Sequence, residues 1–230
     1  MDAWTTNSVQ TADRVSAFLW KVYGWMALGL GLTAMVAFAV AGSPDVQRVL
    51  VGNRLVFFAL VIAQLGLVFY LSARADRLAP GTAAGLFAIY SALTGVTLSV
   101  ILLVYTGESV TMTFVVTAGM FGALALFGST TKRSLAGAGQ FFMMGLIGLI
   151  LASIIGMFWH NDALQFLISV VGVIVFTGLT AYDAQRLKQM ALAVPAGQAG
   201  SYAVVGALSL YLNFINLFLM LLRFTGSRRS

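Results

Sequence analysis

The chain alternates long apolar stretches with short polar connectors. Seven stretches are each roughly twenty residues long, the length a helix needs to cross about 30 Å of hydrocarbon. They run from about Phe18 to Ala41, Leu55 to Ser72, Thr82 to Tyr105, Thr111 to Phe127, Gln140 to Phe158, Leu164 to Tyr182 and Ala203 to Leu222. A helix satisfies its own backbone hydrogen bonds, which lipid cannot do. The pattern therefore predicts an all-α membrane protein with seven transmembrane helices.

The connectors carry turn residues, as in Gly42-Ser43-Pro44-Asp45 and Ala79-Pro80-Gly81. None is long enough to form a soluble domain. We therefore expect a single seven-helix bundle over residues 18–226, with a polar segment at 1–17 and a basic tail at 227–230. Small residues recur every fourth position in two spans, which favours close helix packing. These stripes are Ser91, Gly95 and Ser99, and Gly148, Ala152 and Gly156.

Composition agrees with a membrane protein and excludes several classes of site. Hydrophobic residues make up 60% of the chain and charged residues only 9%, too few for a water-facing surface. There is no cysteine, and the one histidine, His160, is interpreted as structural. No P-loop, GxSxG or HExxH motif is present, so we expect no catalytic residues, no enzymatic activity and no bound cofactor. The sequence contains no basic patch with interleaved aromatic residues, so nucleic-acid binding is not expected. The bundle is compatible with a monomer in the lipid bilayer.

The distribution of Lys and Arg predicts the orientation. With seven spans, one side of the membrane holds eight of them and the other holds five, so the first side is expected to be cytoplasmic, with the N-terminus. The eight are Arg14, Lys21, Arg74, Arg77, Lys132, Arg133, Arg186 and Lys188; the five are Arg48, Arg54, Arg223, Arg228 and Arg229. A six-span bundle with a re-entrant last segment would put the basic tail inside, but the length of 203–222 favours seven spans. The polar, acid-bearing N-terminus is unlike a secretory signal, so we expect the first span to be retained.

Polar residues at apolar depth are the candidate functional residues, because an unpaired polar group in lipid is costly. Ser209, Asn213 and Asn216 share one face of the last span, which indicates that this face points to other helices or to a cavity. Interhelical hydrogen bonding and a role in a pore are both consistent with this pattern. Gln64, in the second span, is expected to hydrogen-bond a neighbouring helix.

Asp183 ends the sixth span, just before Arg186. One interpretation is an interfacial acid paired with Arg186 one turn away. The other is a titratable gate or a transient Ca²⁺ ligand at the inner mouth of a cavity, because carboxylate oxygens are preferred by Ca²⁺.

Two segments carry a family resemblance. FTGLTAYDAQRLK, at 176–188, and ALSLYLNFINLFLMLLRF, at 207–224, resemble the signature segments of the Bax inhibitor-1 family, particularly its bacterial members. The resemblance covers roughly Ala17 to Gly226. It implies a seven-helix fold in which the last helix is central and wrapped by the other six. It also implies a pH-sensitive calcium leak, a bacterial inner membrane location, and gating by an acid pair that shares a proton.

The acid pair is where this chain departs from the family pattern. Asp183 matches the acid of the Tyr-Asp motif, but Asn213 stands at the second acid position, and some relatives carry an acid in place of Gln64. We therefore expect altered or weakened gating, with Asp183, Asn213, Asn216, Ser209, Arg186 and Gln64 as the gating or pore residues. The alternative is a non-transporting regulatory protein that binds other membrane proteins, such as quality-control machinery. An energy-coupled transporter is disfavoured, since buried titratable residues are scarce and no inverted repeat is visible.

Overall fold

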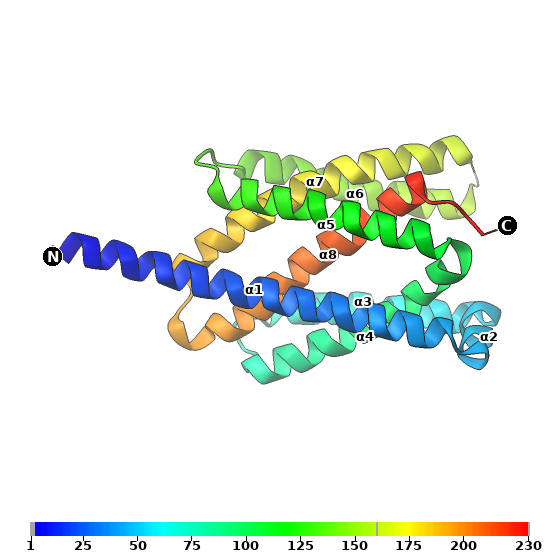
Figure 1. Ribbon diagram of the computed structural model, residues 1–230, viewed down its shortest axis with the longest axis horizontal. Coiled ribbons are helices and arrows are strands. Elements are labelled where there is room, and N and C mark those ends of the chain that lie inside the picture. Colours follow the sequence, from blue (N-terminus) through cyan, green and yellow to red (C-terminus); the bar gives the residue numbers. More distant parts are fainter. Residues whose placement is uncertain (1–2, 160, 230) are drawn as a thin grey trace. The chain divides into compact units, whose positions relative to one another are not determined.

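The computed structural model describes residues 3–159 and 161–229, and 89% of these residues are helical. Within the described part, β structure is limited to an isolated bridge between Tyr105 and Arg228. The helices are α1 (Ala3–Ala41), α2 (Pro44–Gly52), α3 (Arg54–Ala73), α4 (Pro80–Val104), α5 (Gly107–Thr130), α6 (Ala136–Phe158), α7 (Asp162–Ala193) and α8 (Ala199–Thr225), with a short 3-10 turn, η1 (Ala196–Gln198), before the last (Figure 1). Seven of these, all except α2, are long and apolar enough to cross a membrane. The predicted all-α class with seven spanning helices is confirmed.

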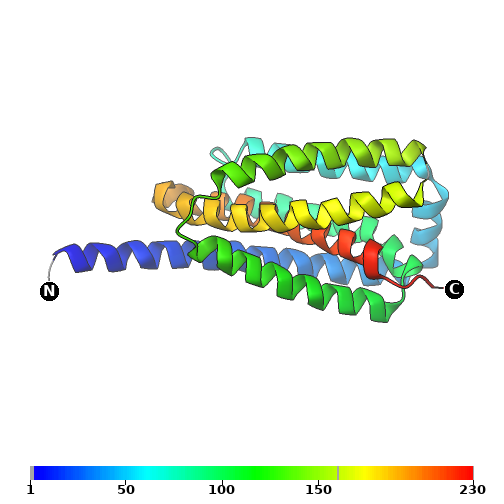
Figure 2. The same cartoon turned by 90° about the horizontal axis from the view of Figure 1, so that it is seen from above.

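The boundaries differ from the prediction at three places, one of which is α7, which continues to Ala193 although its span was predicted to end at Tyr182. The connector after the first span contains the nine-residue helix α2, which lies across the ends of α1 and α3 (Figures 1 and 2). Pro44 and Asp45 lie in the first turn of α2, and both residues are typical of a helix N-terminus. From the sequence alone they are interpreted as part of a turn. Helix α1 also begins earlier than expected, so the polar N-terminal segment is helical from Ala3.

The residues form two compact units, which are described separately. One contains Met1–Val104 and Lys188–Tyr211, and the other contains Tyr105–Leu187 and Leu212–Ser230. Helices α7 and α8 each contribute a part to both units. The two asparagines of α8 belong to the second unit, and Ser209 belongs to the first.

In the first unit, α1 packs against α4 along the first small-residue stripe. A Cβ atom on Gly95 would lie 2.6 Å from the Thr33 carbonyl oxygen and 2.8 Å from Val36, so only glycine permits this approach. Ser91 and Ser99 of the same stripe are buried. The stripe therefore serves helix packing, as the spacing predicts. The second stripe does not act as a unit, because Gly148 faces open space.

A buried hydrogen-bond network joins three helices of the first unit. The Thr33 hydroxyl of α1 donates to the Ser91 carbonyl oxygen at 2.9 Å, and its oxygen lies 2.6 Å from the Tyr211 hydroxyl of α8. Because Thr33 has one hydroxyl hydrogen, Tyr211 must be the donor in their bond. Phe87 and Tyr90 contact the Tyr211 ring edge-on, with centroids 5.6 and 5.8 Å away.

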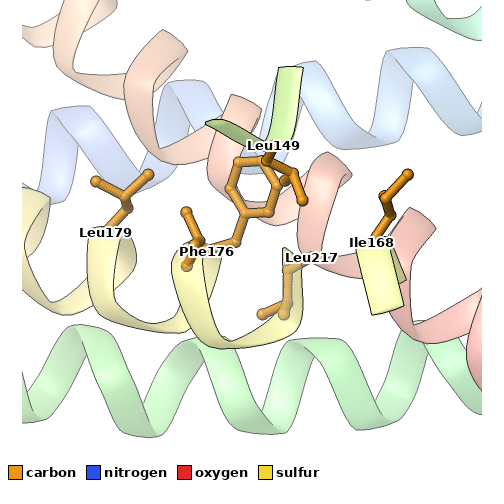
Figure 3. Close-up of a cluster of buried hydrophobic side chains, with 6 residues drawn as sticks. Leu149, Ile168, Phe176, Leu179 and Leu217 are labelled. Carbon is orange, nitrogen blue, oxygen red and sulfur yellow. The ribbon is translucent and has the colours of Figure 1, made fainter. Parts of the chain in front are cut away.

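In the second unit, the C-terminal part of α8 packs among α5, α6 and α7. Leu217 of α8 belongs to a buried cluster with Leu149 of α6 and Ile168, Phe176 and Leu179 of α7 (Figure 3). Phe114 and Phe121 of α5 contact Phe214 edge-on, with centroids 5.4 and 5.5 Å away.

Helix α8 is the most buried of the seven apolar helices. In its most apolar window 56% of residues are buried, against 39% for α7 and 6% for α3. This ranking agrees with the expectation that the last helix lies inside and that its asparagines do not face lipid.

Candidate functional site

The side chains of Asp183 and Asn213 meet inside the second unit. The Asn213 amide, Nδ2, donates to the Oδ2 atom of Asp183 at 2.8 Å, and both residues are buried. Asp183 comes from α7 and Asn213 from α8, thirty positions later in the chain. The sequence prediction that the asparagine-bearing side of the last helix points inward, within reach of this carboxylate, is confirmed.

Two glycines pack against α7 immediately before Asp183. Gly128 of α5 lies against the backbone of Ala181, and Gly139 of α6 lies against the ring of Tyr182. A Cβ atom at either glycine would overlap these groups, so α5 approaches the α7 backbone and α6 approaches the Tyr182 ring too closely for a larger residue at these positions. The position of the Asp183 carboxylate is therefore set by close packing on α5 and α6 as well as by its bond to Asn213.

Gln185 forms a second polar contact beside the pair, and sequence reasoning did not single it out. Its side chain is buried, its Oε1 atom accepts from the Leu135 backbone N–H at 2.8 Å, and its Nε2 atom donates to the Arg133 carbonyl oxygen at 2.9 Å. One amide thus holds the loop between α5 and α6 against α7. The available signal was a polar residue two positions after Asp183, at the end of an apolar span.

The other predicted residues of the two signature segments lie elsewhere. Asn216 is half-buried, and its amide donates to the Leu212 carbonyl oxygen of its own helix at 2.8 Å, so it does not join Asn213 in the contact with α7. Ser209 is half-buried in the first unit.

Arg186 is exposed, and among the described contacts no ion pair links it to Asp183. Asp183 is buried and bonded to Asn213, and Arg186 acts on its carboxylate only through a longer-range electrostatic interaction.

Gln64 joins α3 to α4 in the first unit. Its Nε2 atom lies 3.5 Å from the Leu93 carbonyl oxygen and from the Thr97 hydroxyl, and its Oε1 atom accepts from the Thr94 hydroxyl at 3.3 Å. These contacts confirm the predicted interhelical hydrogen bonding.

The acidic residues outside the signature segments do not assemble into a metal site. Glu108 and Asp162 are exposed, at the starts of α5 and α7, and His160 lies outside the described residues. Over residues 3–159 and 161–229, no three His, Asp or Glu side chains are grouped so that they could hold a metal ion. Since Ca²⁺ takes six to eight oxygen ligands in stable protein sites, the single carboxylate of Asp183 suits transient contact better than tight binding.

These features define an α-helical multi-pass membrane protein with an acid–amide pair buried between its last two helices. The family model described as Inhibitor of apoptosis-promoting Bax1 matches residues 15–230, so the chain belongs to the Bax inhibitor-1 family. Inner membrane protein YbhL of Escherichia coli K12 is 50% identical over 224 residues, covering 96% of both chains.

More distant relatives extend the similarity across bacteria. A protein of Deinococcus radiodurans is 43% identical over 220 residues, which are 95% of this chain and 94% of the relative. Protein RP147 of Rickettsia prowazekii is 39% identical over 230 residues, or 98% and 96% of the two chains. The name of the Escherichia coli relative and the seven apolar helices together support a multi-pass protein of a bacterial inner membrane.

Proposed function

We propose that this protein is a cation leak, with Ca²⁺ as a permeant ion, whose gate is the Asp183–Asn213 pair. The observation that carries the proposal is the buried 2.8 Å hydrogen bond between these side chains. It joins the helices that hold the two signature segments. An ion path along α8 that passes these two side chains can open only if their hydrogen bond breaks or the side chains move together.

The chemistry of the pair predicts weaker or different gating from that of members with two acids. Two neighbouring carboxylates share a proton, and losing it sets like charges against each other. An amide carries no charge at any pH, so Asn213 keeps its bond to Asp183 without repulsion. The closed arrangement is therefore expected to persist from acid to neutral pH.

The proposed orientation has the N-terminus in the cytoplasm, from the excess of Lys and Arg on that side. Asp183 lies 21 residues after Asp162, the first residue of α7, which is about 30 Å of helix rise. In this orientation Asp183 stands near the cytoplasmic end of its span, where it would meet cations at the inner mouth of the path.

The test is calcium flux into proteoliposomes loaded with a calcium-sensitive dye, measured from acid to neutral pH. The wild type is expected to show a small flux that depends little on pH, and Asp183→Asn to reduce it. Asn213→Asp restores an acid pair and is expected to produce flux that rises steeply as the pH approaches neutrality. Asn216→Asp is the matched control, because this position on the same helix does not contact Asp183.

A wild-type flux that rises steeply with pH, as an acid pair would produce, would overturn the weakened gating assigned to the Asp183–Asn213 pair. The absence of flux in every variant, Asn213→Asp included, would overturn the leak itself.

A second candidate, a non-transporting regulatory protein, is favoured by one observation. Asp183 is the one buried carboxylate among the described residues, so the interior offers little charge for conducting cations. This candidate predicts tight vesicles and a stable membrane-protein partner in crosslinking. The polar N-terminal segment or the basic loops are the expected contacts.

A further inference from the structure

A cavity of about 790 Å³ lies in the second unit, at the end opposite Asp183. It is formed where α6 ends, α7 begins and α8 ends. These helix termini mark the depth of the membrane–water interface, and the exposed Trp159 beside them is typical of that depth. The gating pair does not contribute to this cavity.

The polar side of the cavity presents two arginines and one acid. Arg223, Arg228 and Asp162 all line it. A guanidinium has five N–H donors in a planar fork, which matches the oxygens of a phosphate. A carboxylate complements a primary ammonium group, which donates three hydrogen bonds. The three charges together fit a zwitterion that carries a phosphate and an amine.

Arg223 is positioned before any ligand arrives. Its Nη1 atom donates to the Oε1 atom of Gln165 at 3.0 Å, and the Nε2 atom of Gln165 lies 3.4 Å from the Gly156 carbonyl oxygen. A Cβ atom on Gly156 would come within 2.8 Å of the Gln165 amide, so a larger residue at position 156 would displace this side chain. Gln165 accepts only one of the five guanidinium hydrogens, which leaves the fork able to bind oxygens in the cavity.

The backbone that carries Arg228 is also held in place. The Thr106 backbone N–H donates to the Ser227 carbonyl oxygen at 3.1 Å, and the Ser227 N–H donates to the Ser109 hydroxyl at 3.0 Å. Arg228 itself pairs with Tyr105 in the isolated bridge. The chain after α8, which the sequence presents as a basic tail, is thus attached to the start of α5, with the Arg228 side chain on the cavity.

The other wall of the cavity is apolar. Phe166 of α7 and Phe224 of α8 have ring centroids 5.3 Å apart, and Met220 lies one turn before Phe224. Both rings are more than half exposed, at 58% and 51%. An apolar wall beside charged groups at interface depth suits an amphiphile and offers no advantage to a fully water-soluble ligand.

We propose that this cavity binds a phospholipid with a primary amine in its headgroup, of the phosphatidylethanolamine type. The phosphate binds Arg223 and Arg228, the ammonium binds Asp162, and an acyl chain lies along Phe166, Phe224 and Met220. The proposal does not depend on ion conduction.

The test uses the full-length protein, delipidated in detergent, with binding followed as a shift in apparent melting temperature. The probes are dihexanoyl phosphatidylethanolamine, dihexanoyl phosphatidylcholine, dihexanoyl phosphatidylglycerol and free O-phosphoethanolamine. The ethanolamine lipid is expected to bind about tenfold more tightly than each of the others, because they lack either the hydrogen-bonding ammonium or the acyl chain. Equal binding by O-phosphoethanolamine would overturn the assignment to a lipid.

Two matched pairs of variants locate the binding. Arg228→Gln is expected to weaken binding of the ethanolamine lipid about tenfold, whereas Arg229→Gln, next in the chain and not lining the cavity, leaves it unchanged. Asp162→Asn is expected to abolish the preference for ethanolamine over choline, while Glu108→Gln, in the first turn of α5, keeps it. Helical content by circular dichroism shows that each variant is folded. Equal stabilisation of all variants by all lipids would identify a general micelle effect and overturn the proposal.

Discussion

Asn213 of α8 and Asp183 of α7 are joined by a 2.8 Å hydrogen bond, and both side chains are buried. Inside a membrane protein neither group can exchange its partner for bulk water, so each depends on the other for hydrogen bonding. The bond therefore links the rotation of α8 to that of α7. Any change at one residue is expected to alter both the stability of the protein and the state of the proposed gate.

Replacing Asn213 with Leu is expected to lower the free energy of unfolding by about 1–3 kcal/mol, because Asp183 stays buried without its donor. Asn216→Leu, on the same helix, is expected to cost about 1 kcal/mol or less, since the Asn216 amide donates only within α8. Unfolding by sodium dodecyl sulfate in mixed micelles, followed by circular dichroism, measures both values. Equal losses at the two positions would contradict the pairing of Asn213 with Asp183.

Gly128→Ala is expected to destabilise the protein by about 2 kcal/mol or more, because the new Cβ would overlap the Ala181 backbone and push α5 from α7. Gly122→Ala is the control, on the same helix and with open space around its Cβ position. That change is expected to be neutral or to stabilise α5 by up to about 1 kcal/mol, from helix propensity alone. The melting temperatures of the two variants in one detergent should lie on opposite sides of the wild-type value, or Gly128→Ala alone should fall.

Gln185→Ala is expected to release the loop between α5 and α6, because both of its backbone partners, at Arg133 and Leu135, lose their bonds. Limited trypsin digestion measures this directly, since Lys132 and Arg133 are exposed in that loop. Cleavage at these two sites should become about tenfold faster, which corresponds to about 1.4 kcal/mol in the opening of the loop. Gln189→Ala, an exposed position one turn further along α7, should cleave at the wild-type rate.

Thr33→Val is expected to destabilise the protein more than Tyr211→Phe. The valine leaves the buried Tyr211 hydroxyl without its acceptor, whereas the phenylalanine leaves Thr33 bonded to the Ser91 carbonyl oxygen. The expected losses are about 1–3 kcal/mol and about 1 kcal/mol. A double-mutant cycle on unfolding free energies measures the coupling, and additive losses would show that the two hydroxyls do not interact.

The site residues differed in how far the sequence could predict them. Asn213 and Asp183 are polar residues in apolar surroundings, so their inward orientation follows from the cost of exposing them to lipid. The same reasoning grouped Asn216 with Asn213, and Asn216 is half-buried but does not contact α7 through its amide. An asparagine can also satisfy its amide on the preceding turn of its own helix, as Asn216 does with Leu212.

Contacts between distant segments could not be predicted from the sequence. No residue near Gln185 in the sequence indicates that its side chain binds a loop fifty positions earlier. Gly128 is one of many glycines in apolar helices, and the sequence does not distinguish it from the others. Their roles depend on how far each helix is rotated and shifted against its neighbours. Those variables come from the packing of all the side chains together.

The sequence alone determined the class of the protein, its seven apolar helices and the inward orientation of Asn213. These properties follow from segment length and from the cost of polar groups in lipid, which act within each segment. Tertiary structure decided which partner each polar group has. In the tertiary structure Asp183 bonds to Asn213 and not to Arg186, and Gln185 bonds to the α5–α6 loop. Arg223 and Arg228 line one cavity. The physical reason is that hydrogen bonds act over about 3 Å, a precision that only close packing between helices provides.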